Sequence, residues 1–539
     1  MKEMKTFWKI ILGVCVAGCL YELAVAVIHS VDNKKTQQIA AVTDTNYGSF
    51  LAAQHALYVN DFSAASKMIH SVESDVAVVK DIKGYVDFFS GKMPDDVASM
   101  KKDKDLAKRL MYDAHLIQQN DWKNVYLRHN KDTSIFAAPL RIFSAAKQGK
   151  TKEALDYIDS LRTSKSWKAF IRGQIAVLNN DIPRAAKEFA DVHPEFMNIN
   201  DYLYLMSFYK ANGMTEDMDI LYNDFVSKPG GMIILNYKDV PDWSEFEGYK
   251  NNLVFSIVQT ISHTQIMIFT DLSLMMLRFA ELIANESNID AVNYYLGQYY
   301  VYNSGDYKSA FNKISKNHPL YPYGQMKIAE KAGDFEEIKK IAYKNPLFIS
   351  AVEGVIEMDI KNGEKKDALR LINKALKHKD LNNFGRVWFL KRRANVYLMF
   401  NQPDKAQQDL KAAQEIDDRL LSDVLLLQAR IWAQQDRNLD EAYDYAMSLV
   451  KRNTSNVEAW DILGVIVEKR EGLAAALELM ERVGEVSSTT SSLFEHLGDM
   501  YAKQGDIEKA KKSYMRALDL SDDCLVVVPF VQKKLRKLK

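Results

Sequence analysis

The stretch Val457-Glu458-Ala459-Trp460-Asp461-Ile462-Leu463-Gly464 is followed 34 residues later by Ser491-Ser492-Leu493-Phe494-Glu495-His496-Leu497-Gly498. Both copies place an aromatic residue before a Leu-Gly pair, and an alanine follows each glycine at the same distance (Ala476 and Ala510). This period predicts two antiparallel helices in each unit. One unit cannot bury its own apolar face, so the units are expected to stack on their neighbours.

The spacing and the residue types resemble the tetratricopeptide repeat, a helix-turn-helix unit. The resemblance implies that Gly498 lets the two helices approach closely and that Ala510 is small where they cross. Gly505-Asp506 is expected to form the turn, because glycine accepts the left-handed conformation that ends a helix. Alanines at similar spacing extend the pattern toward the N terminus, at Ala442, Ala406 and Ala368.

Paired turn residues continue the pattern still further, at intervals of about 28 to 33 residues apart from one gap. They are Gly333-Asp334, Gly305-Asp306, Gly213-Met214, Asn180-Asp181, Gly149-Lys150, Asn120-Asp121, Gly91-Lys92 and Asn60-Asp61. Only 11 Pro and 23 Gly occur in 539 residues, which favours long helices with short connections. We therefore predict an all-α, TPR-type superhelix of about 12 to 14 helix pairs, whose inner face is free along its length.

Composition divides the chain into six segments. These are 1–30, a signal peptide or membrane anchor; 31–45, a polar tether; 46–225, divergent helical repeats; 226–248, a loop; 249–384, degenerate repeats; and 385–539, well-formed repeats with a basic capping helix. The segment after the loop contains two helical stretches, at 249–262 and 265–284. The second has an apolar face and is interpreted as an amphipathic core helix, with Arg278 and Glu281 facing away from the core.

The first thirty residues carry a targeting signal. Lysines precede an apolar stretch at 10–28, and Val16-Ala17-Gly18-Cys19 is the pattern that bacterial lipoprotein processing reads. Two interpretations compete: a lipid on Cys19 after cleavage, or an uncleaved membrane-spanning helix in which Glu22 would lie within the bilayer. A buried core helix is a third. Both membrane interpretations give the chain an N-terminal membrane-targeting helix, cleaved in the first case and retained in the second, and both place the repeats outside the cytoplasmic membrane, since the lysines stay inside.

The search for chemistry finds no catalytic or cofactor-binding motif. Zinc-protease, serine-hydrolase, phosphate-loop and paired-cysteine patterns are missing from the sequence, and the ten histidines are scattered. We therefore expect a protein that is not an enzyme and uses no cofactor or metal. Lys+Arg and Asp+Glu number 71 each, so no general affinity for nucleic acid is indicated. The basic tail at 533–539 is interpreted as the polar cap of the stack, with contact to anionic lipid or cell-wall polymer as the alternative.

Binding has a stronger physical basis than catalysis. In stacked units of this kind the first helix of each pair lines the inner face, and the repeat register identifies the side chains expected there. The candidate partner-binding residues are Trp388, Lys391, Asn395, Asp461, Asp499 and Lys503, accompanied by the apolar Leu398, Leu427 and Ile431. Such a mixed surface suits an extended peptide. Gln428, Glu458 and Ile462 break the pattern that captures a C-terminal carboxylate, so that mode is not predicted.

The C-terminal half also resembles a family of long bacterial envelope TPR proteins. The matching segments are 438–442, 460–464, 495–501 and 531–535. The family typically has Trp after the repeat glycine, where this chain has Val465, so the chain is a divergent member. Some relatives are lipoprotein adaptors that dock a carboxyl-terminal-processing protease and bring it envelope substrates. The resemblance therefore implies a membrane-tethered scaffold in the bacterial envelope, facing the periplasm, that binds proteins or extended peptides and has such a protease among its candidate partners.

Two alternative functions stay open. The first is a single-pass membrane subunit of a larger envelope assembly, in which residues 10–28 pack against other helices. The second is an enzyme acting on cell-wall material through a site within 226–290.

Overall fold

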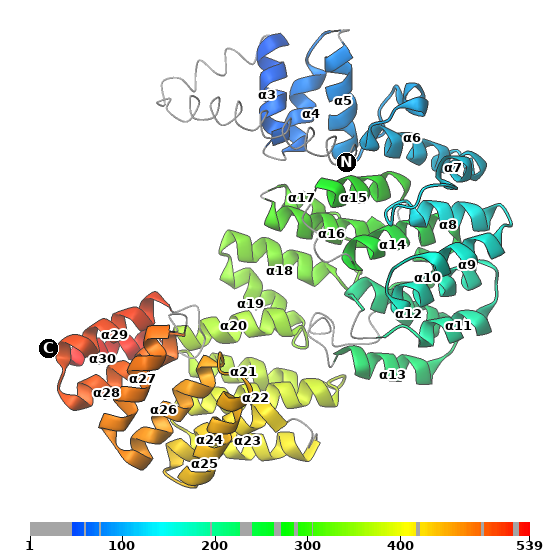
Figure 1. Cartoon of the computed structure of the whole chain (residues 1–539). Helices are drawn as coiled ribbons and strands as arrows, with labels where there is room; N and C mark the ends of the chain where they lie inside the picture. The colour runs from blue at the N-terminus through cyan, green and yellow to red at the C-terminus, as the bar shows by residue number, and fades with distance from the viewer. Residues whose placement is uncertain are drawn as a thin grey trace, which may run out of the picture.

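The computed structural model describes residues 46–58, 61–74, 77–193, 197–226, 240–263, 271–284, 289–303, 305–416, 421–486, 490–520 and 528–538. Every regular element within these ranges is a helix, which confirms the all-α prediction (Figure 1). The predicted membrane segment at 1–30 with Cys19, the tether at 31–45 and most of the predicted loop lie outside the described residues. None of the helices described is long and apolar enough to cross a bilayer.

The helices follow one another as antiparallel pairs joined by short turns. The N-terminal part contains α3 (Asn46–Tyr58), α4 (Phe62–His70), α5 (Ala77–Phe89), η1 (Val97–Lys102), α6 (Leu106–Gln118), α7 (Trp122–His129), α8 (Ala138–Lys147), α9 (Thr151–Ser160), α10 (Lys165–Leu178), α11 (Ile182–Ala190), α12 (Ile199–Ala211) and α13 (Thr215–Val226). The middle contains η4 (Trp243–Glu245), α14 (Gly248–His263), α15 (Asp271–Ile283), α16 (Ile289–Tyr302), α17 (Tyr307–Asn312), α18 (Tyr321–Ala332), α19 (Phe335–Lys344), α20 (Ile349–Lys361) and α21 (Lys365–Leu376). The C-terminal part contains α22 (Asn383–Met399), α23 (Pro403–Ile416), α24 (Leu421–Gln435), α25 (Leu439–Arg452), α26 (Val457–Glu471), α27 (Leu473–Val486), α28 (Ser491–Gln504), α29 (Ile507–Asp519) and α30 (Val528–Lys537).

The predicted turns have a common local structure. A left-handed residue ends the first helix of a pair, as at Gly333 (φ 67°), Gly505 (φ 90°) and Asn120 (φ 58°). An aspartate then caps the second helix: the side chain of Asp334 accepts a hydrogen bond from the backbone N–H of Glu337 at 3.0 Å. Glycine or asparagine followed by aspartate thus supplies both the stop and the start signal, which explains why the turns are the most regular part of the sequence.

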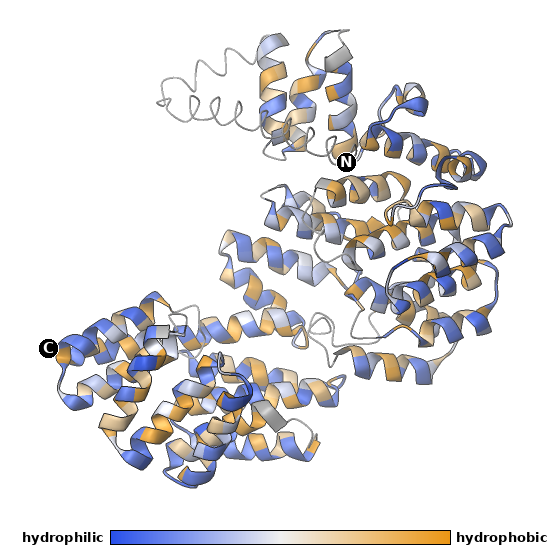
Figure 2. Ribbon diagram, in the orientation of Figure 1, coloured by the Kyte–Doolittle hydropathy of each residue, from blue (hydrophilic) through white to orange (hydrophobic). Residues whose placement is uncertain are grey.

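Small residues allow the two helices of a pair to cross closely, as predicted. A Cβ atom on Gly498 would lie 2.5 Å from the ring of Tyr514, and one on Gly464 would lie 2.1 Å from the sulfur of Met480. Ala510 is fully buried at the same crossing. Figure 2 shows the resulting pattern, in which hydrophobic residues gather on the sides of helices that face their neighbours.

The hairpin of α14 and α15 does not continue the row of pairs. It packs inside the arc formed by the N-terminal helices, where α14 contacts α8 and α10 while α15 contacts α5 and α6 (Figure 1). All residues of α14 from 251 to 262 are buried, on every side of the helix. The prediction of an inner face free along the whole stack is therefore wrong for this half, because the chain's own hairpin fills it.

Polar side chains on α14 fix the hairpin in the arc. Ser256 donates a hydrogen bond to Gln174 of α10 at 2.6 Å, and both side chains are buried. The hydroxyl of Tyr204 on α12 donates to Asn252 at 2.7 Å. Each of these groups would be costly to bury without its partner, so the pairs determine which residues of α14 face which helix.

Two details of this region differ from the sequence interpretation. Arg278 of α15 does not face away from the core: it is 7% exposed, donates to the hydroxyl of Tyr300 at 2.6 Å and forms an ion pair with Glu281. The described end of the predicted loop, residues 240–248, packs against α12, with the Trp243 ring 5.3 Å from the Tyr204 ring. Helical periodicity assigns charged residues to the solvent side, but α15 has protein on both sides.

The C-terminal pairs from α20 to α30 curve until the last helix returns to the first. The Phe530 ring of α30 lies 5.5 Å from the Phe400 ring after α22, and a Cβ on Gly363, before α21, would lie 3.7 Å from Pro529. Val531 is fully buried against the last pair. Helix α30 therefore packs against the last pair and also reaches the turns that follow α20 and α22.

Candidate functional site

The inner face of the C-terminal stack is built from the first helix of each pair. Helices α22, α24, α26 and α28 pack side by side, each against the next. Contact between successive first helices is expected on the inside of a curve, where the spacing is shortest. Close crossing at Gly464 and Gly498 keeps each second helix directly behind its partner. The sequence therefore places the candidate residues on neighbouring helices of one face.

The three candidates on α22 occupy the start of this face. Trp388, Lys391 and Asn395 are all partly exposed. The Trp388 ring packs edge-on against the Phe389 ring at 4.9 Å, so one side of the indole is supported by the core. A supported aromatic ring beside a cation and an amide is a surface that can receive an extended chain.

Asp461 does not lie on the exposed face. Its side chain is fully buried between α26 and α28, where it accepts hydrogen bonds from Ser492 at 2.9 Å and from Nδ1 of His496 at 2.7 Å. Burial alone would raise the pKa of Asp461, but the charge and hydrogen bond of His496 outweigh it and lower that pKa. Asp461 therefore joins two successive pairs and is not available to a partner.

Asp499 is already engaged by the chain. It accepts a hydrogen bond from the hydroxyl of Tyr514 at 2.6 Å and pairs with Lys534 of the capping helix at 2.7 Å. Burial alone would lower the pKa of Lys534, but the nearby carboxylates of Glu495 and Asp499 have the larger effect and raise that pKa above its usual value. The cap thus neutralises the acidic end of the inner face.

Lys503 lies at the exposed edge of the face. Its ammonium pairs with Glu468 of the preceding first helix at 2.6 Å, and its side chain is 57% exposed. Lys469 pairs with Asp436 in the same way, one unit earlier. These ion pairs form a ladder between successive first helices. Exposed pairs of this kind stabilise by less than about 1 kcal/mol each, so their charges remain accessible to a competing partner.

The apolar residues predicted on the inner face are mostly used for packing. Leu398, Leu427 and Ile431 are 2%, 6% and 0% exposed. They belong to one apolar cluster with residues of α22, α23 and α24, including Ala406 and Leu410. The accessible face is therefore aromatic and polar, centred on Trp388, Asn395 and Lys503.

No group of three or more His, Cys, Asp or Glu side chains in the described ranges is arranged to hold a metal ion.

Comparison with known proteins adds structural relatives only. The sequence matches no protein-family model and no curated protein. Three solved structures resemble it in fold. A tetratricopeptide repeat protein from Parabacteroides merdae is 14% identical with a TM-score of 0.32, over 47% of this chain and 92% of that one. Cut9–Hcn1 of the APC/C is 14% identical with a TM-score of 0.32, over 90% and 95%. Yeast Tom70 is 12% identical with a TM-score of 0.27, over 93% and 96%.

Proposed function

We propose that the C-terminal stack, α20–α30, is a scaffold that binds other proteins by holding an extended segment along the inner face of α22–α28. One observation carries this proposal. Trp388, Lys391 and Asn395 of the first helix α22 are partly exposed and Lys503 of the first helix α28 is exposed, whereas α14–α15 cover the corresponding surface of the N-terminal arc.

The chemistry of this face suits a peptide with both apolar and charged residues. Trp388 offers a large ring supported from behind by Phe389, the type of anchor that dominates binding energy at interfaces. The Glu468–Lys503 and Asp436–Lys469 pairs can exchange one protein partner for a charge on the bound segment at little net cost. Such exchange favours specificity and association rate more than affinity.

The cellular setting of the scaffold is a further part of the proposal. The lipoprotein-like Val16-Ala17-Gly18-Cys19 and the resemblance to envelope TPR proteins support attachment to a membrane, with the repeats in the periplasm. Under this proposal the bound segments belong to envelope proteins, with a carboxyl-terminal-processing protease and its substrates as candidates. An uncleaved anchor in a larger assembly would use the same binding face.

Site-specific photo-crosslinking in intact cells tests the binding face. A benzoylphenylalanine at Asn395 on the inner face is expected to crosslink other proteins, because it stands beside Trp388. The same group at Lys411, exposed on the second helix α23, is the matched control and is expected to give little or no crosslinking. Equal yields at both positions, or yield at Lys411 alone, would contradict the proposal.

Charge reversal at Lys391 in the same cells measures how much this residue contributes to partner binding. Lys391→Glu is expected to lower the Asn395 crosslink yield at least fivefold, while Lys411→Glu leaves it unchanged. A Cys19→Ala variant tests how the chain is attached to the membrane. If the chain is a lipoprotein, the variant loses its lipid label and leaves the membrane fraction. If residues 10–28 are an uncleaved anchor, the variant keeps its mass and stays in the membrane fraction. Crosslinks that survive Lys391→Glu at full yield would remove that residue from the binding face.

A further inference from the structure

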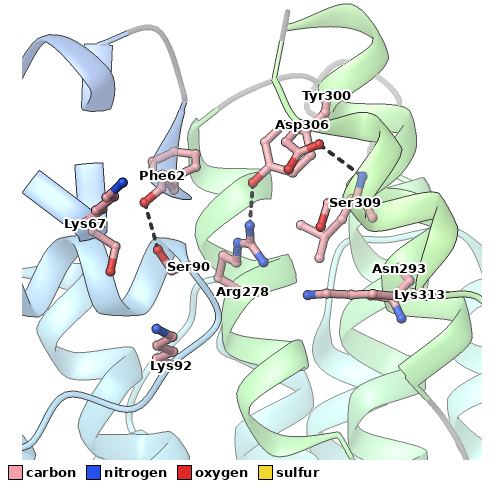
Figure 3. Close-up of a pocket in the computed structure, with 13 residues that line it drawn as sticks. Phe62, Lys67, Ser90, Lys92, Arg278, Asn293, Tyr300, Asp306, Ser309 and Lys313 are labelled. Carbon is pink, nitrogen blue, oxygen red and sulfur yellow. Dashed lines mark hydrogen bonds between the residues drawn. The ribbon is translucent and has the colours of Figure 1, made fainter. Parts of the chain in front are cut away.

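A cavity of about 380 Å³ lies between the N-terminal helices and the middle of the chain (Figure 3). Phe62 and Ser90 line one wall, and Arg278, Tyr300 and Lys313 line the other. Its volume falls at the lower end of the range for small-molecule sites, about 300–1,000 Å³. The cavity is remote in sequence from the binding face of the C-terminal stack, and it does not depend on the scaffold function.

The two walls are held together by specific contacts. Within the first wall, Ser90 donates a hydrogen bond to the carbonyl of Phe62 at 3.1 Å; across the cavity, the Phe62 ring lies 6.4 Å from the Tyr300 ring. Gly91 ends α5 with φ 76°, and a Cβ there would lie 2.4 Å from the carboxylate of Glu281. The left-handed backbone at Gly91 favours glycine, and the turn after α5 lies next to the Glu281 side chain of α15. The cavity is therefore a built junction between segments that are distant in sequence.

Positive charge dominates the lining. Lys67, Lys92, Arg278 and Lys313 contribute cations, and Asp306 is the acidic residue among the lining side chains, although Glu281 already pairs with Arg278 and Lys313. The carboxylate of Asp306 is already used to cap α17, where it accepts from the backbone N–H of Ser309 at 3.0 Å. Lys67 and Lys92 are exposed and form no ion pair within the described part of the chain. Their charges are available to an anion.

A buried polar side chain also lacks a partner at this site. Asn293 lines the cavity and is 1% exposed, yet neither its amide nitrogen nor its amide oxygen has a hydrogen-bond partner among the described residues. It stands four positions before Gly297, in the slot that later pairs fill with Trp460 and Phe494. The Nε of Arg278, another lining residue, also has no hydrogen-bond partner among the described residues. Buried polar groups are normally hydrogen-bonded, so an amide in an apolar slot points to a ligand.

We propose that this cavity binds a small organic phosphate. Lys67, Lys92 and Arg278 would contact the phosphate oxygens, since Lys and Arg are the residues that bind phosphate through charge-assisted hydrogen bonds. Asn293 supplies one donor and one acceptor to the remainder of the ligand. The rings of Phe62 and Tyr300 give this remainder an apolar wall. The cavity is too small for a folded peptide, which sets the ligand class apart from the partners of the C-terminal face.

Isothermal titration calorimetry on the full chain tests the proposal with defined probes. Glucose 6-phosphate and glycerol 3-phosphate are expected to bind with one-to-one stoichiometry. The double variant Lys67→Gln/Lys92→Gln is expected to weaken both affinities at least tenfold. Lys308→Gln, an exposed lysine of α17 outside the cavity, is the matched control and is expected to change neither. No saturable binding, or equal affinity in the double variant, would overturn the proposal, and equally tight citrate binding would overturn the preference for phosphate.

Asn293→Leu separates a ligand-binding role from a structural one. Leucine fills the slot with an apolar group of similar size, so the ligand-free melting temperature is expected to stay the same or rise. The rise in melting temperature that glucose 6-phosphate produces in the native chain is expected to shrink in this variant. A large drop in the ligand-free melting temperature with full retention of the ligand effect would show that Asn293 serves only the fold.

Discussion

Replacing Asp113 by alanine is expected to lower the free energy of unfolding by about 3–5 kcal/mol, the usual loss when one partner of a buried ion pair is removed. The carboxylate of Asp113 on α6 is fully buried, and it accepts hydrogen bonds from Nε of Arg128 at 2.5 Å and from Nε2 of His129 at 2.8 Å. Alanine would leave two donors of α7 without their acceptor. Urea unfolding, followed by hydrogen exchange of the α6–α7 amides, measures the loss.

In Asp113→Ala the free energy of unfolding is also expected to depend less on pH than in the native chain. Burial alone lowers the pKa of His129, but its hydrogen bond to Asp113 and the nearby negative charges of Asp113 and Asp132 outweigh burial and raise that pKa above 6.5. A histidine with a raised folded-state pKa stabilises fully below its unfolded pKa, and this contribution disappears as the pH rises through the folded value. The difference in free energy of unfolding between the native chain and Asp113→Ala is therefore expected to be larger at pH 6 than at pH 9.

Asp219→Ala is the matched control for this prediction. Asp219 is exposed on α13, and a surface substitution of this kind is expected to change stability by about 0.5 kcal/mol or less. A loss below about 1 kcal/mol in Asp113→Ala, or a loss that grows as the pH rises, would contradict the role assigned to the Asp113–His129 pair.

Gly498→Ala and Gly354→Ala are expected to change stability in opposite directions. The Cβ added at Gly498 would lie 2.5 Å from the Tyr514 ring, which is 2% exposed and held through its hydroxyl by Asp499. Overpacking of this kind costs about 1–3 kcal/mol, enough to outweigh the gain of about 1 kcal/mol in helix propensity. Around Gly354 in α20 no atom lies within 4 Å of the added Cβ, so only the propensity gain remains.

Thermal unfolding of the two variants measures this contrast. The melting temperature is expected to fall for Gly498→Ala and to rise for Gly354→Ala. Equal shifts in the two variants would mean that the close crossing of α28 and α29 does not depend on glycine.

The local signals in the sequence determined most of the C-terminal fold. The 34-residue period, the glycines at helix crossings and the turn motif with Asp506 all have physical causes that act within one pair. Such causes can be recognised without knowledge of the rest of the chain. The predictions for Gly498, Ala510 and Gly505 were confirmed for this reason.

The position of α14 and α15 could not be predicted in this way. Their apolar faces indicate burial, but periodicity does not say which helices bury them. In the sequence, the polar residues of α14 look like a solvent-exposed side of the helix. Their hydrogen-bond partners cannot be identified from the sequence, because Ser256 bonds to Gln174 of α10, far earlier in the chain. The cavity beside Arg278 could not be predicted for the same reason, because residues of α4 and α16 that line it are distant in sequence. One signal was present in the sequence: Asn293 occupies a repeat position that is apolar in other pairs.

The candidate site was predicted in part. Repeat register predicts that Trp388, Asn395 and Lys503 share one face, because position within a pair sets the direction of a side chain, and all three are at least partly exposed. It failed for Asp461, which is buried by Ser492 and His496 of the next unit. Register describes one pair, whereas exposure also depends on how tightly the next pair packs.

The central claim is that the two halves are stabilised differently. Contacts between neighbouring pairs stabilise the C-terminal stack, whereas the N-terminal arc requires α14–α15 as its core. Urea unfolding of fragment 46–226, followed by circular dichroism, tests this directly, with fragment 46–303 as the control that restores the hairpin. We predict a broad, non-cooperative transition for 46–226 and a cooperative one for 46–303. A cooperative transition at the same urea midpoint in both fragments would contradict the claim.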